Sequence, residues 1–387
     1  MARICMVVHA YYPYDVRVRR EAQALADDNH SVEVICLRDE NEGARDHLNG
    51  VQIHRLPIRK ERGGVSRYFF EYLAFFALVA FYLALLNVRR RFQIIHVHNM
   101  PDFLVFSAII PRLFGSKIIL DVHDPMPELF VSIYGLEPDH WVIGMLRFQE
   151  KASCLFADLI ITVNNSMRER IIGLGIVSNK VFVVFNSPDI ALQKPTKTLR
   201  RNRPRVFTLV YAGTIAKRYG LDVAVEAIAS LTGKMKDIKL LIIGSGNYMQ
   251  ELRELILQCG MQQFIELRGN ISHEALINLL GQCDAGISPH RNDSFWKLYF
   301  STKILEYFSV GLPVVSSRTK TIEAYLKDSV FYFEPGDALG MAKQIRLLRT
   351  RPDLVKAKKK IAEGVLLELR WENEKTKLRD LVLELAA

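Results

Sequence analysis

Short apolar runs alternate with helix-like stretches along most of the sequence. In the first half, the runs that predict buried strands are Arg3–Val8, Ser31–Leu37, Phe92–His98, Lys117–Val122, Leu159–Val163 and Val181–Phe185. Between the first two runs, Val18, Ala22 and Leu25 follow the spacing of one helix face. Strands that alternate with helices indicate βαβ units around a parallel sheet with both faces covered.

The alternation stops at Asn186–Arg205, which contains three prolines and a run of basic residues and predicts a linker. It then resumes, with strands expected at Phe207–Tyr211, Lys239–Ile243, Phe264–Arg268, Ala285–Ser288, Pro313–Ser316 and Val330–Phe333. A last helix begins near Trp371. We therefore predict an α/β protein with two doubly wound, Rossmann-like domains and ligands near the carboxyl ends of the strands. The expected parts are a domain at 1–187, a linker at 188–205, a domain at 206–365 and a C-terminal helix at 366–387.

Tyr72–Leu86 departs from this pattern because it is fifteen apolar residues in a row, with arginines on both sides. A membrane span needs about 20 apolar residues, and a span would place strands of one sheet on opposite sides of the bilayer. A buried helix and an interfacial helix both remain open. The interfacial alternative implies a peripheral membrane contact through 68–91, because basic flanks suit an anionic lipid surface.

The net charge of +10 is unevenly distributed. Residues 1–195 hold 22 Lys and Arg against 21 Asp and Glu, whereas the remainder holds 30 against 21. The near-neutral first half, with no nucleic-acid-binding motif, argues against a nucleic-acid partner. None of the five cysteines has CxxC spacing, and no signal peptide is visible, so we expect reduced thiols in a cytoplasmic protein.

The first predicted strand leads into a loop that ends at Asp15 and contains Pro13. No glycine precedes Gly43, so we expect no dinucleotide site here. The loop could admit a substrate or be a plain connection. Arg17 and Arg20 at the start of the next helix oppose the helix dipole, which is tolerable if they bind an anion or are solvated.

Further polar groups follow other predicted strands. His123 ends one in the first domain, where α/β proteins gather functional groups. In the second domain, Gly213 permits close approach of a ligand, and Lys217 and Arg218 suit phosphate. Gly244-Ser-Gly246 is a weak dinucleotide signal but a reasonable phosphate loop.

The most informative block is Ser301-Thr302-Lys303-Ile-Leu-Glu306. Small polar residues open a helix there, and exposed N–H groups at such a position suit a diphosphate. Lys303 adds positive charge, and the Glu306 carboxylate one turn later suits vicinal ribose hydroxyls. A structural role alone does not explain this pair on an otherwise apolar helix.

The chain resembles the retaining glycosyltransferases of family 4, which have the GT-B fold. The resemblance rests on an ordered set of segments: "PYDVRVRREAQALADDNHSVEVIC", "FQIIHVHNMPDFL", "IILDVHDPMPELF", "YAGTIAKRYGLDVAVEAI", "LLIIGSGNYMQEL", "IELRGNISHEALINLLGQCDAGISP" and "STKILEYFSVGLPVVSS". It implies two domains that face a cleft and a last helix that crosses back to the first. It also implies sugar transfer from a nucleotide-diphosphate donor, UDP- or GDP-linked, with no metal or other cofactor. We expect a lipid-linked or glycan acceptor of surface-glycan biosynthesis, and the lipid part of this expectation rests on the apolar segment Tyr72–Leu86 with its basic flanks.

Roles for individual residues follow from the same resemblance. Arg218 and Lys303 would face the diphosphate, Glu306 the ribose, and His123 the donor sugar near the reaction centre. The expected donor site further contains Gly213, Thr214, Lys217, Gly244, Gly246, Arg268, Gly269, Asn270, Ser301 and Thr302. The expected acceptor site contains Tyr12, Asp15 and Arg17.

The sequence departs from the family pattern at two charged positions. Leu298 stands where the first of two glutamates, eight residues before Glu306, often contacts the sugar, and Tyr219 stands where a lysine often precedes the second-domain glycine. Two alternatives therefore stay open. One is a GT-B-like nucleotide-sugar 2-epimerase, and the other is a non-catalytic partner that keeps the donor fold.

Overall fold

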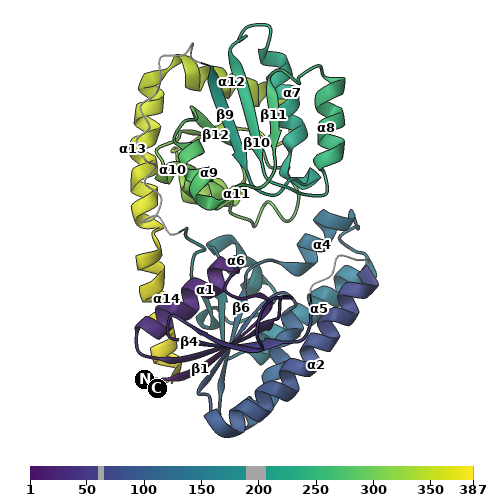
Figure 1. Ribbon diagram of the computed structural model, residues 1–387, viewed down its shortest axis with the longest axis vertical. Helices are drawn as coiled ribbons and strands as arrows, with labels where there is room; N and C mark the ends of the chain where they lie inside the picture. The colour runs from purple at the N-terminus through teal and green to yellow at the C-terminus, as the bar shows by residue number, and fades with distance from the viewer. Residues whose placement is uncertain (60–64, 189–205, 387) are drawn as a thin grey trace. The chain divides into compact units, whose positions relative to one another are not determined.

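The computed structural model describes residues 1–59, 65–188 and 206–386. The chain divides into two compact units, Met1–Asn186 together with Glu372–Ala387, and Ser187–Trp371 (Figure 1). Both have the α/β architecture predicted from the sequence. Apart from Pro188, the predicted linker lies outside the described residues.

An eight-stranded sheet forms the centre of the first unit, in the order β3-β4-β2-β1-β5-β6-β7-β8. Its strands are β1 (Arg3–Tyr11), β2 (Ser31–Leu37), β3 (Arg45–Leu48), β4 (Val51–Leu56), β5 (Ile94–His98), β6 (Lys117–Val122), β7 (Leu159–Thr162) and β8 (Val181–Val183). All neighbours pair in parallel except β3 and β4. After β1 the chain adds strands on one side of it, and from β5 onward it adds them on the other side. A crevice for ligands is expected where this strand order reverses, at the carboxyl ends of β1 and β5.

The helices of this unit are α1 (Val16–Asp27), α2 (Val65–Arg90), η1 (Asp102–Ala108), α3 (Ile109–Leu113), α4 (Met126–Tyr134), α5 (Trp141–Phe156), α6 (Asn165–Gly173), η2 (Ser178–Lys180) and α14 (Trp371–Ala386). Asp15 starts α1 because its side chain accepts hydrogen bonds from the backbone N–H groups of Arg17 and Val18.

The C-terminal helix α14 belongs to the first unit. Its buried side chains include Leu378 and Val382, and a Glu374 carboxylate oxygen accepts the backbone N–H of Phe185 at 2.7 Å. The preceding helix, α13 (Pro352–Glu368), extends beyond the boundary predicted at residue 366. The last helix itself starts at Trp371, near which the sequence predicted its beginning.

The second unit contains a wholly parallel sheet in the order β11-β10-β9-β12-β13-β14. Its strands are β9 (Phe207–Ala212), β10 (Ile238–Ile243), β11 (Ile265–Arg268), β12 (Ala285–Ser288), β13 (Val314–Ser317) and β14 (Phe331–Phe333). Its other helices are η4 (Lys217–Tyr219), α7 (Leu221–Leu231), α8 (Met249–Gln258), α9 (His273–Leu280), α10 (Lys303–Ser309), α11 (Lys320–Leu326) and α12 (Ala338–Thr350).

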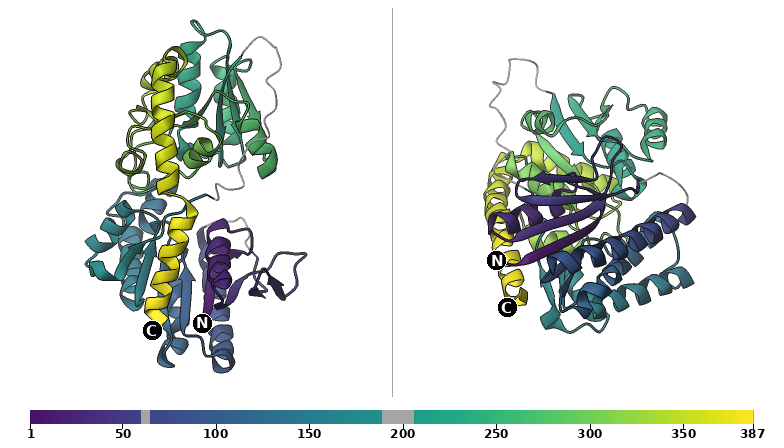
Figure 2. Two further views of the ribbon diagram at one scale, coloured as in Figure 1. Left: turned by 90° about the vertical axis from the view of Figure 1, so that its left-hand side faces the viewer. Right: turned by 60° about the horizontal axis from the view of Figure 1, so that its bottom comes forward.

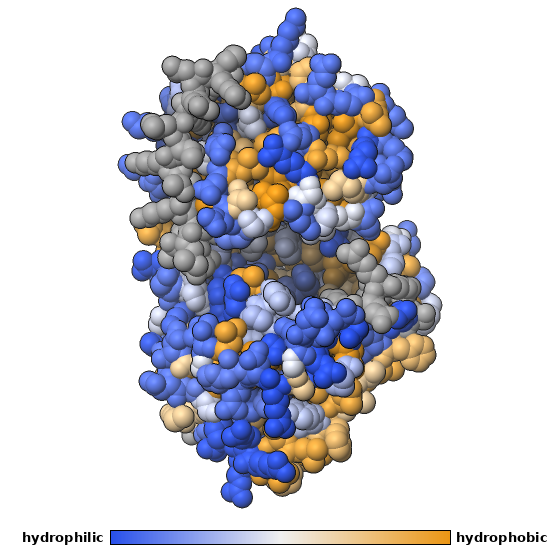
Figure 3. All heavy atoms as spheres, viewed as in Figure 1, coloured by the Kyte–Doolittle hydropathy of each residue, from blue (hydrophilic) through white to orange (hydrophobic). Residues whose placement is uncertain are grey.

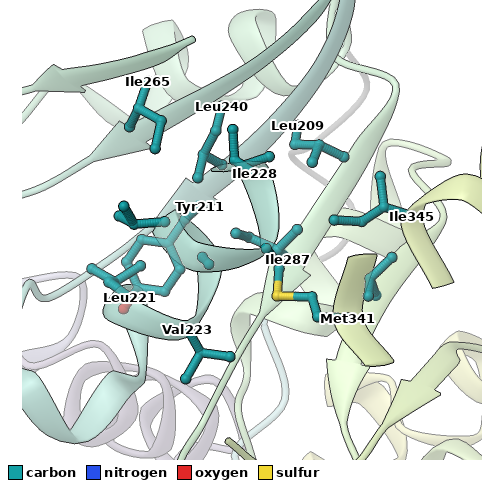
Figure 4. Packing of buried hydrophobic residues seen from close by; sticks show 14 of the residues in the cluster. Leu209, Tyr211, Leu221, Val223, Ile228, Leu240, Ile265, Ile287, Met341 and Ile345 are labelled. Atoms are coloured by element: carbon teal, nitrogen blue, oxygen red, sulfur yellow. The ribbon is translucent and has the colours of Figure 1, made fainter. Parts of the chain in front are cut away.

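The core of this unit lies between the central strands and the helices α7 and α12. Leu209, Tyr211 and Ile287 from the strands pack with Ile228 and Met341 from those helices (Figure 4). The sheet order is that of a dinucleotide-binding fold, with its reversal between β9 and β12. The loop after β9 is therefore where a ligand is expected.

Candidate active site

The loop after β9 meets the first residue of α10. Gly213 has a φ of +143°, and a Cβ atom there would lie 2.9 Å from Lys303 Nζ. The positive φ favours glycine at this position, and the absence of a Cβ atom leaves room for the ammonium group. The loop and the lysine predicted from the sequence are thus brought together.

Lys303 Nζ is buried and has no hydrogen-bond partner among the residues that the structure describes. It lies 3.9 Å from the ring centroid of Tyr211 and 4.9 Å from that of Tyr219, so aromatic faces stabilise it. Burial lowers the pKa of Lys303 to about 7, and the Glu306 carboxylate opposes this shift. A buried ammonium group that lacks an anion beside a glycine loop is suited to receive a negatively charged ligand.

A second cation lies near the same tyrosine. The Arg218 guanidinium is 5.4 Å from the ring centroid of Tyr219 and 5.8 Å from that of Phe295, and its Nε is buried without a partner. Lys217, one residue earlier, is exposed. Of the two adjacent cations predicted for phosphate, the structure favours Arg218.

A cavity of about 350 Å³ adjoins Gly213. It is lined by Ala212, Gly213, Thr214, Ile243, Gly244, Ser245, Asn270, Ile271, Leu276 and Glu306. These residues follow the carboxyl ends of β9, β10 and β11 and include the first turn of α10. A larger cavity of about 770 Å³ lies at the opposite edge of this sheet, by Phe207 and Asp284. Because ligands of such sheets bind at the carboxyl edge, we take the smaller one as the candidate site.

The two glycines after β10 allow the loops beside this cavity to pack closely. A Cβ atom at Gly244 would lie 1.9 Å from Gly213 O, and one at Gly246 would lie 2.0 Å from Ile215 O. Both positions therefore require glycine for contact between two loops, and a phosphate need not be invoked.

Other predicted donor residues have partners within the protein. Arg268 Nε donates to Glu266 on the same strand, and Asn270 Nδ2 donates to Ser245 Oγ at 3.1 Å. Ser301 is buried, and its hydroxyl accepts from Ser288 Oγ at 3.3 Å. Gly269 and Thr302 do not line the cavity. Because α10 has only seven residues, the positive charge at its start comes mainly from Lys303.

In the first unit, His123 follows β6 and is held from two sides. Its Nε2 lies 2.8 Å from Asp121 Oδ2, and its backbone N–H donates to Asn99 Oδ1 at 2.7 Å. Burial lowers the pKa of His123, but the Asp121 carboxylate raises it by more, so the net shift is upward. The ring is thus oriented, and its cationic form is favoured. Its predicted place near a reaction centre stays a prediction.

Asp121 is the buried centre of a network of hydrogen bonds and ion pairs that was not predicted from the sequence. It accepts from Arg17 Nε at 2.9 Å and Nη2 at 2.8 Å, and lies 3.1 Å from His98 Nδ1. Burial raises the pKa of Asp121, yet Arg17 and His123 hold it well below its usual range. This network could have been predicted from two patterns at the ends of β5 and β6, His96-Val-His98 and Asp121-Val-His123.

Two predicted acceptor residues are buried in this arrangement. The side chain of Arg17 is 5% exposed, and besides Asp121 it bonds to Glu21 and to Val184 O. Tyr12 is 1% exposed, and burial raises the pKa of its hydroxyl to about 12. Their contact with a sugar acceptor stays a prediction. Asp15 acts as the cap of α1.

A group of possible metal ligands lies in the same network. Ligand atoms of Glu21, His96, His98 and Asp121 all lie within 4.8 Å of one another. Arg17 already pairs with both carboxylates, and its guanidinium supplies the positive charge that a metal ion would bring. The donor types suit a metal, but the neighbouring guanidinium opposes one.

Comparison with known proteins identifies the family. The domain described as "Glycosyl transferase 4-like domain" matches residues 14–187, and "Glycosyl transferases group 1" matches residues 196–364. The chain belongs to glycosyltransferase family 4. The family resemblance predicted from the sequence is thus confirmed.

Its curated relatives are distant. The "Phosphatidylinositol N-acetylglucosaminyltransferase GPI3 subunit" of Saccharomyces cerevisiae is 21% identical over 84% of this chain and 70% of its own length. A phosphatidylinositol N-acetylglucosaminyltransferase component from Arabidopsis thaliana is 23% identical over 66% of this chain and 54% of its own length. The present chain thus covers only part of the length of each of these relatives.

Solved structures confirm the GT-B fold. Sucrose-phosphate synthase from Thermosynechococcus elongatus superposes with a TM-score of 0.80 at 17% identity, covering 100% of this chain and 99% of that one. Anabaena Alr3699/HepE, solved in complex with UDP, gives 0.74 at 15% identity, covering 99% and 100%. At such identities the likeness concerns the fold alone.

Proposed function

We propose that this glycosyltransferase moves a sugar from a UDP- or GDP-sugar to a lipid-linked glycan acceptor, with retention of the anomeric configuration and without a metal ion. The observation that carries the donor half is the buried, unpartnered Lys303 ammonium against Gly213. A nucleotide diphosphate supplies the negative charge that this group lacks.

Each part of the donor has a matching group. Lys303 and Arg218 would bind the diphosphate and stabilise the charge that develops on it as the leaving group. Glu306, one turn further along α10 and on the cavity wall, would accept hydrogen bonds from the ribose hydroxyls. Thr214 and Asn270 line the remaining wall. The complex of the Anabaena neighbour with UDP supports this class of ligand.

The proposed step breaks the bond between the anomeric carbon and the diphosphate oxygen. A bond forms on the same face between that carbon and the acceptor hydroxyl, and the hydroxyl proton passes to the departing phosphate oxygen. Lys303 and Arg218 carry the charge that a metal ion supplies in other transferases. His123, held by Asp121, would contact the donor sugar.

The lipid-linked acceptor rests on the relatives. The names of the yeast and Arabidopsis proteins specify phosphatidylinositol, and a Candida albicans relative is a chitobiosyldiphosphodolichol beta-mannosyltransferase. These printed acceptors are lipids. A protein that acts on a lipid-linked acceptor works at a membrane surface, and we propose that this is the cytoplasmic face.

The test begins with donor binding. Calorimetry with UDP and GDP should show saturable binding that Lys303→Met weakens by about ten- to a hundredfold. Lys217→Met is the matched control, since Lys217 is exposed and adjacent to Arg218, and it should change the affinity less than about twofold. Equal affinities for the wild type and Lys303→Met would disprove the site.

Turnover then separates transfer from the two alternatives. Release of UDP or GDP that requires a lipid-linked acceptor and persists with EDTA supports the proposal, and the anomeric configuration of the product decides retention. Conversion of the donor without an acceptor indicates an epimerase. Leu298 at the position of the missing glutamate favours a donor-binding protein without turnover, which binding without release would reveal.

A further inference from the structure

Helix α2 is apolar on two opposite faces. Phe75, Val79 and Leu83, four residues apart, are fully buried against the sheet. On the other side, Phe81 is 66% and Val88 is 71% exposed. A surface helix normally turns a polar face to water. The alternative of a buried helix therefore describes one face of α2, and the other face is left unexplained by it.

Polar contacts fix α2 to the first unit along its length. His9 Nε2 lies 3.0 Å from Glu71 Oε1 near its start, and Arg90 Nε lies 3.0 Å from the buried Glu33 at its end. By length and composition alone, Phe70–Arg90 could cross a membrane. Crossing would pull these ion pairs into hydrocarbon, where unmatched polar groups are costly. The helix is thus part of the wall of this unit, with its apolar face turned outward.

The apolar surface continues onto two neighbouring helices. Leu113 and Phe114, at the end of α3, are about three-quarters exposed, as are Trp141 and Phe148, which lie two turns apart on α5. More than half of the exposed large hydrophobic side chains that the structure describes lie between residues 70 and 155. Solvent-exposed apolar groups in such number mark an interaction site.

These three helices adjoin one another. Phe76 of α2 packs on Phe103 of η1, which continues directly into α3, and Phe106 of η1 packs on Phe156 of α5. Two views show α2 and α5 side by side (Figures 1 and 2). Hydrophobic residues gather over α2 along the lower right edge of the unit (Figure 3). We call the surface formed by Phe81, Leu85, Leu113, Phe114, Trp141 and Phe148 the docking face.

The charges on these helices have one sign. Arg89, Arg91, Lys117, Arg147 and Lys151 lie on or beside α2, α3 and α5 and are exposed. No acidic side chain is exposed among the described residues of these three helices, because Glu71 and Glu150 are buried in ion pairs. Glu137 and Asp139 are exposed only in the loop before α5. An apolar face bordered by cations is complementary to an anionic lipid surface.

We propose that the docking face inserts into the interfacial region of a bilayer that contains anionic lipid. Aromatic and aliphatic side chains of α2, α3 and α5 enter the boundary between headgroups and acyl chains, and the surrounding arginines and lysines contact lipid phosphates. The strands before and after α2, β4 and β5, stay in the same sheet when the face is inserted. This inference goes beyond the proposed function and does not depend on the identity of donor or acceptor.

Flotation of the full chain with vesicles tests the proposal. The protein should float with phosphatidylcholine vesicles in which about 30% of the lipid is phosphatidylglycerol, a fraction ample for anionic recognition. Phe81→Ser combined with Phe148→Ser should lower the partition coefficient by about tenfold or more. The matched control is Leu257→Ser with Leu339→Ser, two residues that are similarly exposed but lie on the second unit. It should float like the wild type.

Trp141 reports where the protein sits. It is largely exposed, whereas Trp296 is buried and Trp371, at the start of α14, is half-buried. In a Trp371→Phe background, the emission of Trp141 should shift to the blue and be quenched by brominated acyl chains on binding. Arg89→Gln with Arg147→Gln should weaken binding to anionic vesicles and reduce its salt dependence, since two of the five exposed cations are removed.

Three results overturn the inference. The first is flotation of the Phe81→Ser, Phe148→Ser variant like the wild type, and the second is a Trp141 emission that brominated lipid does not quench. The third is a wild type that does not bind vesicles but forms a dimer, which this variant dissociates. The last would assign the face to a second copy. Calorimetry with UDP keeps this inference separate from the proposed function. The docking-face variants should bind UDP like the wild type, and Lys303→Met should float normally.

Discussion

The two units each bury a cation at the carboxyl edge of a parallel sheet, and they treat it in opposite ways. Arg17 in the first unit meets Asp121 and Glu21 at hydrogen-bond distance. Lys303 in the second unit lies against two aromatic faces and near Glu306, and its Nζ has no hydrogen-bond partner in the described part of the chain. A paired buried charge fixes a structure, whereas an unpaired one raises the energy of the free protein and is relieved by a ligand.

The largest expected effect comes from breaking the paired charge. Arg17→Met removes the guanidinium from the buried carboxyl groups of Asp121 and Glu21, and His98 and His123 remain beside Asp121. Unfolding by urea should show a loss of about 3–5 kcal/mol. Arg20→Met, one turn away in a partly exposed position, should cost less than about 1 kcal/mol. Similar losses for both variants would contradict the contrast between the units.

Removal of the unpaired charge should have the opposite effect on stability. Lys303→Met replaces a buried ammonium by an apolar chain of similar length, so the free protein should be as stable as the wild type or more stable by about 1 kcal/mol. Thermal melts without ligand measure this, and UDP should raise the melting temperature of the wild type much more than that of the variant. A variant that is clearly less stable than the wild type would show that Lys303 has a structural role.

The pH dependence of donor binding sharpens the same point. Below a pKa of about 7 Lys303 is charged in the free protein and attracts a diphosphate, and above it a bound diphosphate must first recharge the amine. Affinity for a UDP-sugar, whose diphosphate does not titrate in this range, should fall by up to about tenfold per pH unit above pH 7. Lys303→Met should lose this dependence. Calorimetry between pH 6 and 9 provides the comparison.

The smallest expected effect concerns a neutral group on the cavity wall. Asn270→Ala removes the hydrogen bond to Ser245 Oγ and one polar contact with the proposed donor. Affinity for UDP should fall by about two- to threefold, with no change in its pH dependence. A loss as large as that of Lys303→Met would move the centre of binding away from the lysine.

The sequence predicted most strands because buried parallel strands are continuous apolar runs. It missed β3 and β4. The residues of β3 are all exposed, and β4 contains His54 and Arg55, which become acceptable in a buried strand through contacts with Glu33 and Asp46. Such pairs form only in the folded chain and leave no trace in local periodicity.

The candidate site was predictable where its chemistry is local. Lys303 and Glu306 occupy one turn of one helix, and Gly213 directly follows a strand. The ion pair of Arg17 could not be predicted, because its partner Asp121 lies 104 positions away. A cation at a helix start has the same appearance in sequence whether it binds a substrate or a buried carboxylate.

The return of α14 to the first unit has a consequence for biosynthesis. Phe185 obtains an acceptor for its backbone N–H from a residue 189 positions later. While the ribosome makes the second unit, the apolar surface that α14 covers is therefore exposed in the first unit. The backbone N–H of Phe185 then lacks its hydrogen-bond acceptor. The folding of the first unit is completed only when Glu372–Ala387 emerges, so a premature stop in the second unit would leave both units defective.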